Sequence, residues 1–343
     1  MKNILLGFVA FLLIACSDNA SEKQTNIPHK EPQQTRVIKA FGMNPPLTVL
    51  LEILNPEGMV GLNYKPYPED IVFMPPNIAD LPVLGHMGDR SALFEAIAQL
   101  KPDVVFFSDT TPLEVLEPYE KVGIKVVRVE GYGFESLGSA IESYKDALGG
   151  GDSAVGKKAD ALIAFVQKSI DTLQTLSEAI TSRPKIYFAQ GFDGLKSQCS
   201  DGDNQQELAY RIGGVNALPC SILTNPSHQV SINFEILASI NPEVIFVREL
   251  PFYKELMSNP PQEWQSLKAF EDKRIYYAPS TPSNWLMRPP SVMQSIGFLW
   301  AFSKVQPTLL DDESVKQEAQ NFFHTFLRDL SDNDYERIQG LKD

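Results

Sequence analysis

Arginine, aromatic and amide side chains stand in several short loops of this 343-residue chain, and their chemistry suits ligand binding. Arg288 lies in the turn WLMRPPS (residues 285–291), where its planar guanidinium could clamp an anion through two parallel hydrogen bonds. It could equally tie this turn to the rest of the fold. Trp285 precedes two prolines, and we expect it to form a wall of a ligand pocket.

The histidine and cysteine residues give weaker indications of a metal or disulfide site. His86 and His228 precede two segments that begin Phe-Glu, and each could coordinate a metal or simply be a hydrogen-bonded loop residue. The chain has four histidines and neither an HExxH nor a CxxC motif, which argues against a structural zinc site. Cys199 and Cys220 could form a disulfide in an oxidising compartment or remain free thiols.

The sequence lacks the motifs of common enzyme classes. It has no GxSxG elbow, no P-loop and no GxGxxG at a strand-to-helix turn, so we expect a non-enzyme without a resident cofactor. The 43 acidic and 30 basic side chains give a net charge of −13, which disfavours nucleic-acid binding.

The N-terminus predicts export. Lys2 precedes an apolar run over residues 4–15 that is too short to span a bilayer, as in a cleaved signal. The run ends Leu-Ile-Ala before Cys16, which resembles a bacterial lipobox and predicts that Cys16 carries a lipid. Residues 1–15 are therefore expected to be the signal peptide and 16–35 a polar, flexible tether on a membrane surface.

Beyond residue 36 the chain alternates short apolar runs with amphipathic stretches, which is typical of an α/β fold. Strands are predicted over residues 36–41, 103–107, 125–129, 185–189, 243–247 and 274–277. Helices are predicted between them, including residues 46–54, 92–100 and 113–121.

An internal repeat predicts two lobes. Residues 94–107 read FEAIAQLKPDVVFF and residues 234–247 read FEILASINPEVIFV. In both, a short helix opened by Phe-Glu meets a Pro-acid corner and then a buried strand. Glu95 and Glu235 are expected at the first turn of equivalent helices, one on each lobe.

A long amphipathic helix is predicted between the lobes. Its apolar residues recur every three or four positions over residues 153–182, until Arg183-Pro184 ends it. The N-terminal lobe is then expected over residues 36–152 and the C-terminal lobe over 183–343, with only small closure of one lobe on the other.

Motifs along residues 36–330 resemble the periplasmic metal-complex and vitamin-B12 binding proteins of ABC importers, the TroA-like class III group. They are LPVLG (81–85), the segment 95–107, GIKVV (123–127), GGVN (213–216) and the segments 231–245 and 264–276. YFAQGFDGL (187–195) and WLMRPPS (285–291), with Gly297 and Trp300, resemble the subgroup whose usual cargo is a ferric siderophore.

The resemblance implies two Rossmann-like lobes joined by one backbone helix, with a ligand cleft between them. Ligands in such lobes lie beyond the carboxyl ends of the strands, where loops converge. The ligand-binding candidates on these loops are Asn44, Tyr64, His86, Gln190, Phe192, Arg248, Trp285 and Arg288, with His86 and His228 as the weaker metal candidates.

The resemblance also implies a partner. In that family the glutamates that correspond to Glu95 and Glu235 dock onto arginines of a permease dimer, which works with ATPase subunits; a local role at a helix N-terminus is the alternative. We expect a monomer that delivers a metal complex, most readily a ferric siderophore. Molybdate, tungstate, nickel or cobalt complexes and cobalamin stay open, as does a surface adhesin that kept the fold without transport.

Overall fold

The computed structural model describes residues 36–85, 90–130, 133–201, 207–223 and 229–342, and residues 37–343 form one compact unit. The predicted signal peptide and tether, with Cys16, lie outside the described residues, as do His86 and His228. Within the described ranges, no helix has the length and apolar character needed to cross a membrane.

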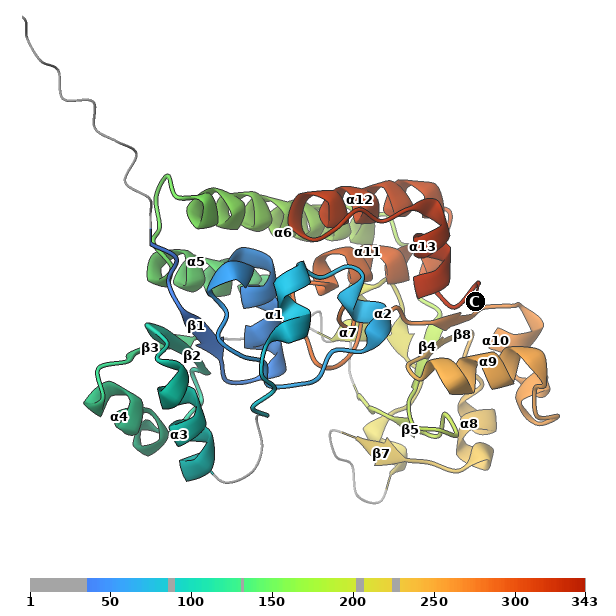
Figure 1. Cartoon of the computed structure of the whole chain (residues 1–343). Helices are drawn as coiled ribbons and strands as arrows, with labels where there is room; N and C mark the ends of the chain where they lie inside the picture. The colour runs from blue at the N-terminus through green and yellow to red at the C-terminus, as the bar shows by residue number, and fades with distance from the viewer. Residues whose placement is uncertain (1–35, 86–89, 131–132, 202–206, 224–228, 343) are drawn as a thin grey trace, which may run out of the picture. The chain divides into compact units, whose positions relative to one another are not determined.

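A first lobe is built on a parallel sheet of three strands in the order β1-β2-β3 (Figure 1). The strands are β1 (Ala40–Gly42), β2 (Val104–Ser108) and β3 (Lys125–Val129), close to three of the predicted runs. Its helices are α1 (Pro45–Leu54), α2 (Pro68–Ile71), α3 (Arg90–Leu100), α4 (Leu113–Lys121) and α5 (Leu137–Ala147).

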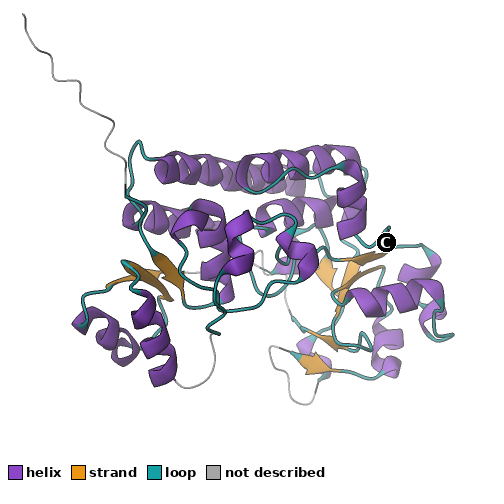
Figure 2. Cartoon of the chain, in the orientation of Figure 1, coloured by secondary structure: helices purple, strands orange, loops and turns teal. Residues whose placement is uncertain are grey.

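A second lobe is built on a parallel sheet in the order β6-β4-β8-β9, beside an antiparallel pair of short strands, β5 and β7. The strands are β4 (Lys185–Ala189), β5 (Lys196–Ser197), β6 (Val215–Asn216), β7 (Val230–Ser231), β8 (Val244–Val247) and β9 (Ile275–Tyr277). Its helices are α7 (Leu208–Arg211), α8 (Phe234–Ile240), α9 (Leu250–Ser258) and α10 (Lys268–Glu271). Helices flank the sheet of each lobe (Figure 2), so the α/β prediction is confirmed.

The internal repeat is a repeat of structure. The connection from α3 to β2 has the same geometry as the connection from α8 to β8. Lys101 in the first and Asn241 in the second take the left-handed conformation (φ 50° and 40°). The acid that follows each proline then accepts a hydrogen bond from the backbone N–H at the start of the neighbouring strand. Asp103 accepts from Lys39 at 2.8 Å, and Glu243 accepts from Lys185 at 2.9 Å.

One detail of the repeat was predicted wrongly. α3 begins at Arg90, so Glu95 lies beyond the first turn, whereas Glu235 is in the first turn of α8. Residues 90–93 contain no proline or glycine, so the helix extends towards the N-terminus beyond the Phe-Glu pair.

The predicted connecting helix is α6 (Ala154–Glu178), whose N-terminus is capped by the Ser153 hydroxyl accepting from the Gly156 N–H. It ends four residues before the predicted limit at 182. Two C-terminal helices, α11 (Gln294–Val305) and α12 (Asp312–Phe326), pack against α6 (Figure 1), and α13 (Asp332–Ile338) follows.

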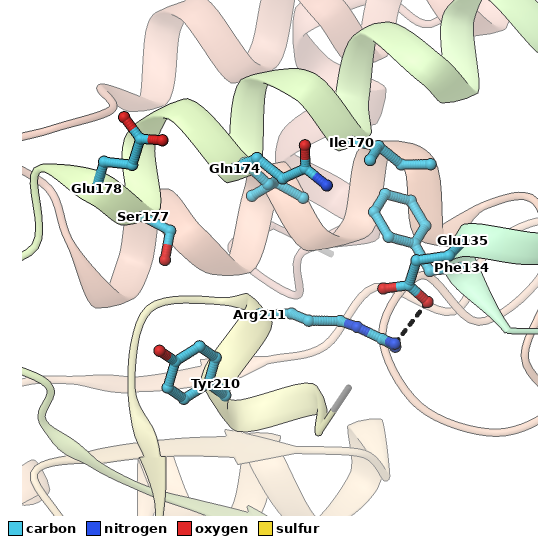
Figure 3. Close-up of a pocket in the computed structure, with 9 residues that line it drawn as sticks. Phe134, Glu135, Ile170, Gln174, Ser177, Glu178, Tyr210 and Arg211 are labelled. Carbon is cyan, nitrogen blue, oxygen red and sulfur yellow. Dashed lines mark hydrogen bonds and ion pairs between the residues drawn. The ribbon is translucent and has the colours of Figure 1, made fainter. Parts of the chain in front are cut away.

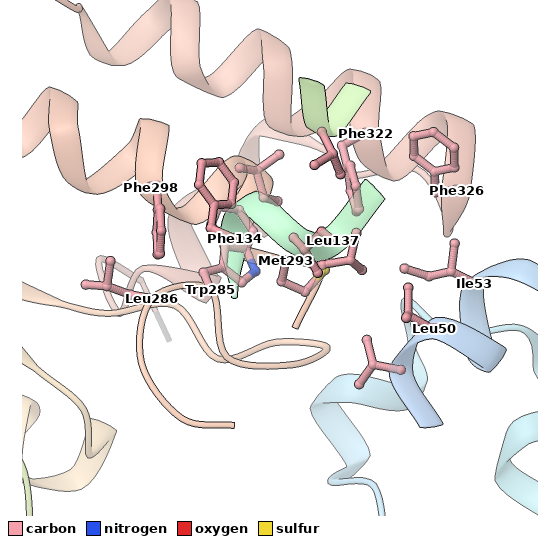
Figure 4. Packing of buried hydrophobic residues seen from close by; sticks show 14 of the residues in the cluster. Leu50, Ile53, Phe134, Leu137, Trp285, Leu286, Met293, Phe298, Phe322 and Phe326 are labelled. Atoms are coloured by element: carbon pink, nitrogen blue, oxygen red, sulfur yellow. The ribbon is translucent and has the colours of Figure 1, made fainter. Parts of the chain in front are cut away.

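Aromatic side chains join these helices to the first lobe in a common core (Figure 4). On α12, Phe322 packs on Phe165 of α6, with ring centroids 5.1 Å apart, and Phe323 packs on Phe73 of the first lobe at 5.5 Å. The C-terminal segment therefore covers both the connecting helix and a loop of the other lobe, which the sequence did not indicate.

Trp285 belongs to this core, which corrects its prediction as a pocket wall. It is 0% exposed, its ring lies 6.0 Å from that of Phe323, and its indole N–H donates to the Thr281 carbonyl at 3.0 Å. The turn of residues 285–291 directs Trp285 inward because Asn284 accepts the backbone N–H groups of Leu286 and Met287. In the second lobe, Cys199 and Cys220 form a disulfide.

Candidate functional site

A cavity of about 390 Å³ lies between the two lobes, and we call it the arginine-pair cavity. The first lobe contributes the start of α1 and the segment that leads into α2. The second lobe contributes the end of β8 and the loop after β9. The lining residues are Pro45, Val49, Tyr64, Tyr67, Asp70, Arg248, Glu249, Ser280, Pro282, Ser283, Asn284, Arg288 and Pro289.

The second lobe provides two cations. Arg248 directly follows β8, and its Nη2 donates to the Arg288 backbone carbonyl at 3.4 Å. Its other terminal nitrogen lies 3.9 Å from the carboxylate of Glu249. Arg288 is exposed. Two guanidinium groups beside one cavity favour a ligand that carries negative charge.

The first lobe contributes Tyr64 and Tyr67 to the cavity lining, and the buried acid Glu52 lies behind Tyr64. The Tyr64 hydroxyl donates to Glu52 Oε1 at 2.7 Å, and the Tyr67 ring is 68% exposed. Burial raises the pKa of Glu52 to about 7 and that of Tyr64 well above its usual range. Tyr64 therefore presents a neutral phenol to the cavity, with its proton directed at Glu52.

Four predicted ligand residues do not line this cavity, and one of them is Trp285, which belongs to the core. Asn44 caps α1, with its side-chain oxygen accepting from the Leu47 N–H at 3.1 Å. Gln190 is buried after β4 and accepts from the Gln229 side chain at 3.2 Å. Phe192 is 87% exposed. Of the eight candidates, the cavity thus brings together Tyr64, Arg248 and Arg288, while His86 lies outside the described residues.

The sequence analysis missed Asp70, which is only 6% exposed and lines the cavity. Its side chain accepts the Tyr67 N–H at 3.4 Å in a capping box at the start of α2. It also missed Glu52, which is 3% exposed. A single acid within the apolar helix PPLTVLLEIL was a signal for the latter, because an acid on a buried face needs a partner.

A second, larger cavity of about 630 Å³ lies along α6 (Figure 3), and we call it the α6 cavity. Its guanidinium group is Arg211 of α7, which is paired with Glu135 of the first lobe at 2.5 Å. Burial lowers the pKa of Arg211 while Glu135 counteracts this effect. Nearby, the guanidinium of Arg183 stacks 3.7 Å from the centre of the Tyr210 ring.

The two glutamates of the repeat lie outside both cavities. Glu95 on α3 and Glu235 on α8 are exposed, one on each lobe. Their side chains are therefore accessible to another protein.

Comparison with known proteins identifies the family to which this fold belongs. Residues 74–282 match the family described as "Periplasmic binding protein". An ABC transporter solute binding protein from Sulfurospirillum deleyianum is 25% identical, with a TM-score of 0.71 over 89% of this chain and 94% of that one. A periplasmic solute binding protein from Veillonella parvula is 21% identical, with a TM-score of 0.72 over 89% of this chain and 92% of that one.

A curated relative, the molybdate-binding protein MolA of Haemophilus influenzae, is 22% identical over 278 residues, which are 76% of each chain. Proteins of this family bind substrates for ABC importers and are not enzymes, and their location is periplasmic. The match to the family covers more than half of the chain. The chain therefore belongs to the periplasmic binding protein family and is a substrate-binding protein of an ABC transporter.

Proposed function

We propose that this binding protein captures an anionic metal complex in the arginine-pair cavity and delivers it to its importer. The observation that carries the proposal is the placement of Arg248 and Arg288 on one cavity between the lobes. Tyr64, Ser280 and Ser283 add hydroxyl groups on the same walls. Such neutral groups fix a ligand's orientation, while the guanidinium groups select its charge.

A ferric siderophore or a similar chelate is the cargo class that the cavity favours. Its volume of about 390 Å³ lies in the range of small-molecule pockets, roughly 300–1,000 Å³. The exposed ring of Tyr67 offers an aromatic face for the organic part of such a chelate.

Molybdate or tungstate is the second candidate. The curated relative that matches 76% of this chain is a molybdate-binding protein. The same two arginines and the serine hydroxyls could hold a tetrahedral oxyanion, which would leave part of the cavity to water.

A thermal-shift panel on the detergent-solubilised full chain tests the proposal. It contains ferric catecholate and hydroxamate chelates, molybdate, tungstate, nickel and cobalt with and without histidine, haem and cobalamin. A true cargo at 100 times its Kd stabilises the fold by about 2.7 kcal/mol, a shift of several degrees. We expect one anionic class to stabilise; stabilisation by cobalamin or a cationic complex alone would contradict the proposal, and silence across the panel would favour an adhesin.

For delivery, we propose that Glu95 and Glu235 dock onto basic residues of the permease. Both are exposed at corresponding positions of the repeat, which gives each lobe one charge. Glu95→Lys and Glu235→Lys together should abolish uptake of the cargo by cells while the purified protein binds it unchanged. Glu120→Lys, an exposed charge reversal on α4, is the matched control. Uptake that survives the double reversal would exclude these residues from docking.

We also propose that Cys16 carries the lipid that anchors the exported chain. The support is the sequence pattern that precedes it. Cys16→Ser should move the protein from the membrane fraction to the soluble fraction and abolish its labelling by a radioactive fatty acid. Retention and labelling of that variant would contradict the anchor.

A further inference from the structure

Asp70 is a buried acid in the wall of a cavity that we propose to hold an anion. Its side chain is 6% exposed and its carboxyl group receives the Tyr67 N–H and the Thr281 hydroxyl. Thr281 belongs to the second lobe, so Asp70 also links the two sides of the cavity. An ionised carboxylate at this position would repel the cargo that Arg248 and Arg288 attract.

The groups around Asp70 offer it little compensation for a negative charge. Three further acids act in the same region: Glu69 beside it on α2, Glu52 on α1, and Glu249 after β8. The negative charge of Asp70 also raises the pKa values of the Tyr64 and Tyr277 phenols. The cations of the cavity are Arg248, whose partner is Glu249, and the exposed Arg288.

This environment makes the protonated acid accessible near neutral pH. Burial raises the pKa of Asp70 to about 7, and the hydrogen bonds from Thr281 and Tyr67 oppose that rise. In the free protein at neutral pH, protonated and ionised forms are therefore both populated.

We propose that Asp70 binds the cargo as a carboxylic acid, donating its O–H to an oxygen of the anion, so that capture of each cargo takes up a proton. The proton comes from solvent onto Oδ1 of Asp70, and Oδ2 keeps accepting the Tyr67 N–H. A bound anion favours the neutral acid, and the neutral acid favours the anion, because linkage is reciprocal. The proposal rests on the anionic cargo proposed above and deepens it by naming the protonation state of the site.

The consequence is a pH-dependent affinity. Below the pKa of Asp70 in the free protein, the acid is already protonated and affinity is flat. Above it, each binding event must first protonate the carboxylate, so affinity falls by up to about tenfold per pH unit.

Isothermal titration calorimetry of the full chain with molybdate, tungstate and a ferric catecholate tests the proposal. Titrations run from about pH 6 to about pH 8.5, in pairs of buffers that differ in ionisation enthalpy, and the heat of injecting each anion into buffer alone is subtracted. The buffer dependence of the heat gives the number of protons taken up. We expect uptake that rises towards one proton per bound anion as the pH increases.

Asp70→Asn is the decisive variant, because its amide keeps an acceptor for Thr281 and Tyr67 and still offers a donor to the anion. It should bind the anion with pH-independent affinity and no proton uptake. Glu52→Gln, which changes a buried acid outside the cavity lining, should retain proton uptake.

Two failures are distinguishable. If an anion binds the wild-type chain without proton uptake, or if Asp70→Asn keeps the pH dependence, the role of Asp70 is refuted while the anionic cargo stands. If no anion binds the wild-type chain at any pH, both the anionic cargo and the role of Asp70 are refuted.

Discussion

The arginine-pair cavity and the α6 cavity each contain arginine, but the guanidinium groups of the two cavities differ in how closely they are paired with acids. In the α6 cavity, Arg211 is paired with Glu135 at 2.5 Å. In the arginine-pair cavity, Arg248 lies 3.9 Å from Glu249, and Arg288 is exposed. The larger cavity is thus the electrostatically satisfied one, and the smaller has charge left for cargo.

The difference also assigns roles. Arg211 comes from the second lobe and Glu135 from the first, so their ion pair joins the lobes and stabilises one arrangement of them. Arg248 and Arg288 both come from the second lobe, so the charge they offer does not depend on the position of the first.

The largest expected effect is a loss of folding stability when the core below the arginine-pair cavity is disrupted. Trp285→Ala removes a fully buried indole below the loop that carries Arg288, and it should destabilise the fold by about 3–5 kcal/mol. Urea unfolding measures this loss. Trp285→Phe keeps most of the apolar volume and loses only the bond to the Thr281 carbonyl, so its loss should be clearly smaller. Equal stability of Trp285→Ala and the wild type would place this side chain outside the core.

The comparison itself is tested by removing the guanidinium groups. Arg288→Ala should weaken cargo binding by about tenfold or more, and Arg248→Ala with Arg288→Ala by about a hundredfold, since each loses a charge-assisted contact. Arg211→Ala, in the α6 cavity, should leave affinity within about threefold and cost about 1 kcal/mol of stability through its half-exposed partner. Titration of the cargo identified by thermal shift measures the affinities. If Arg211→Ala lowered the affinity for the cargo more than the double variant did, the α6 cavity and not the arginine-pair cavity would be the binding site.

The smallest effect concerns the buried acid behind Tyr64. The pKa of Glu52 is about 7 in the fold and 4.5 as an ordinary glutamate, so the folded chain binds more protons between these values. Stability attributable to Glu52 is therefore greatest below about pH 4.5, falls as the pH rises to 7, and is level above it. Glu52→Gln should stabilise the fold by about 1–3 kcal/mol near pH 8 and by nothing near pH 4.

Thermal unfolding at the two pH values measures this difference, with the exposed Glu120→Gln as the control that should show none. The same gain at both pH values would show that packing, not ionisation, is responsible.

The internal repeat shows which structural features a local sequence pattern can predict. Phe-Glu, proline and acid at matching positions predicted α3–β2 and α8–β8, because a helix end and a strand start depend on neighbours within a few residues. The left-handed conformations of Lys101 and Asn241 complete the same corner in both lobes. Glu95 was misplaced because residues 90–93 contain no proline or glycine, so nothing in the local pattern starts the helix at the Phe-Glu pair.

The site was predictable only in part. The charges of Arg248 and Arg288 and their loops after strands were visible in the sequence, and the cavity brings them together with Tyr64. From its sequence neighbours, Asp70 is only an acid in the first turn of a short helix. It becomes part of the cavity because the fold brings it next to Thr281, which is far away in the sequence. For Trp285 the prediction of a pocket wall was wrong, because the hydrogen bonds of Asn284 and the packing of Phe323 direct its ring into the core.

The sequence by itself determined the α/β class, the repeat, the connecting helix and the importer family, since apolar periodicity, prolines and motif order are local properties. The tertiary structure decided which arginine is satisfied and which is available. It also decided which aromatic side chains are core, and how Asp70 and Glu52 ionise. Burial and the approach of groups far apart in sequence set all of these, because the free energy of a charge depends on what surrounds it in space.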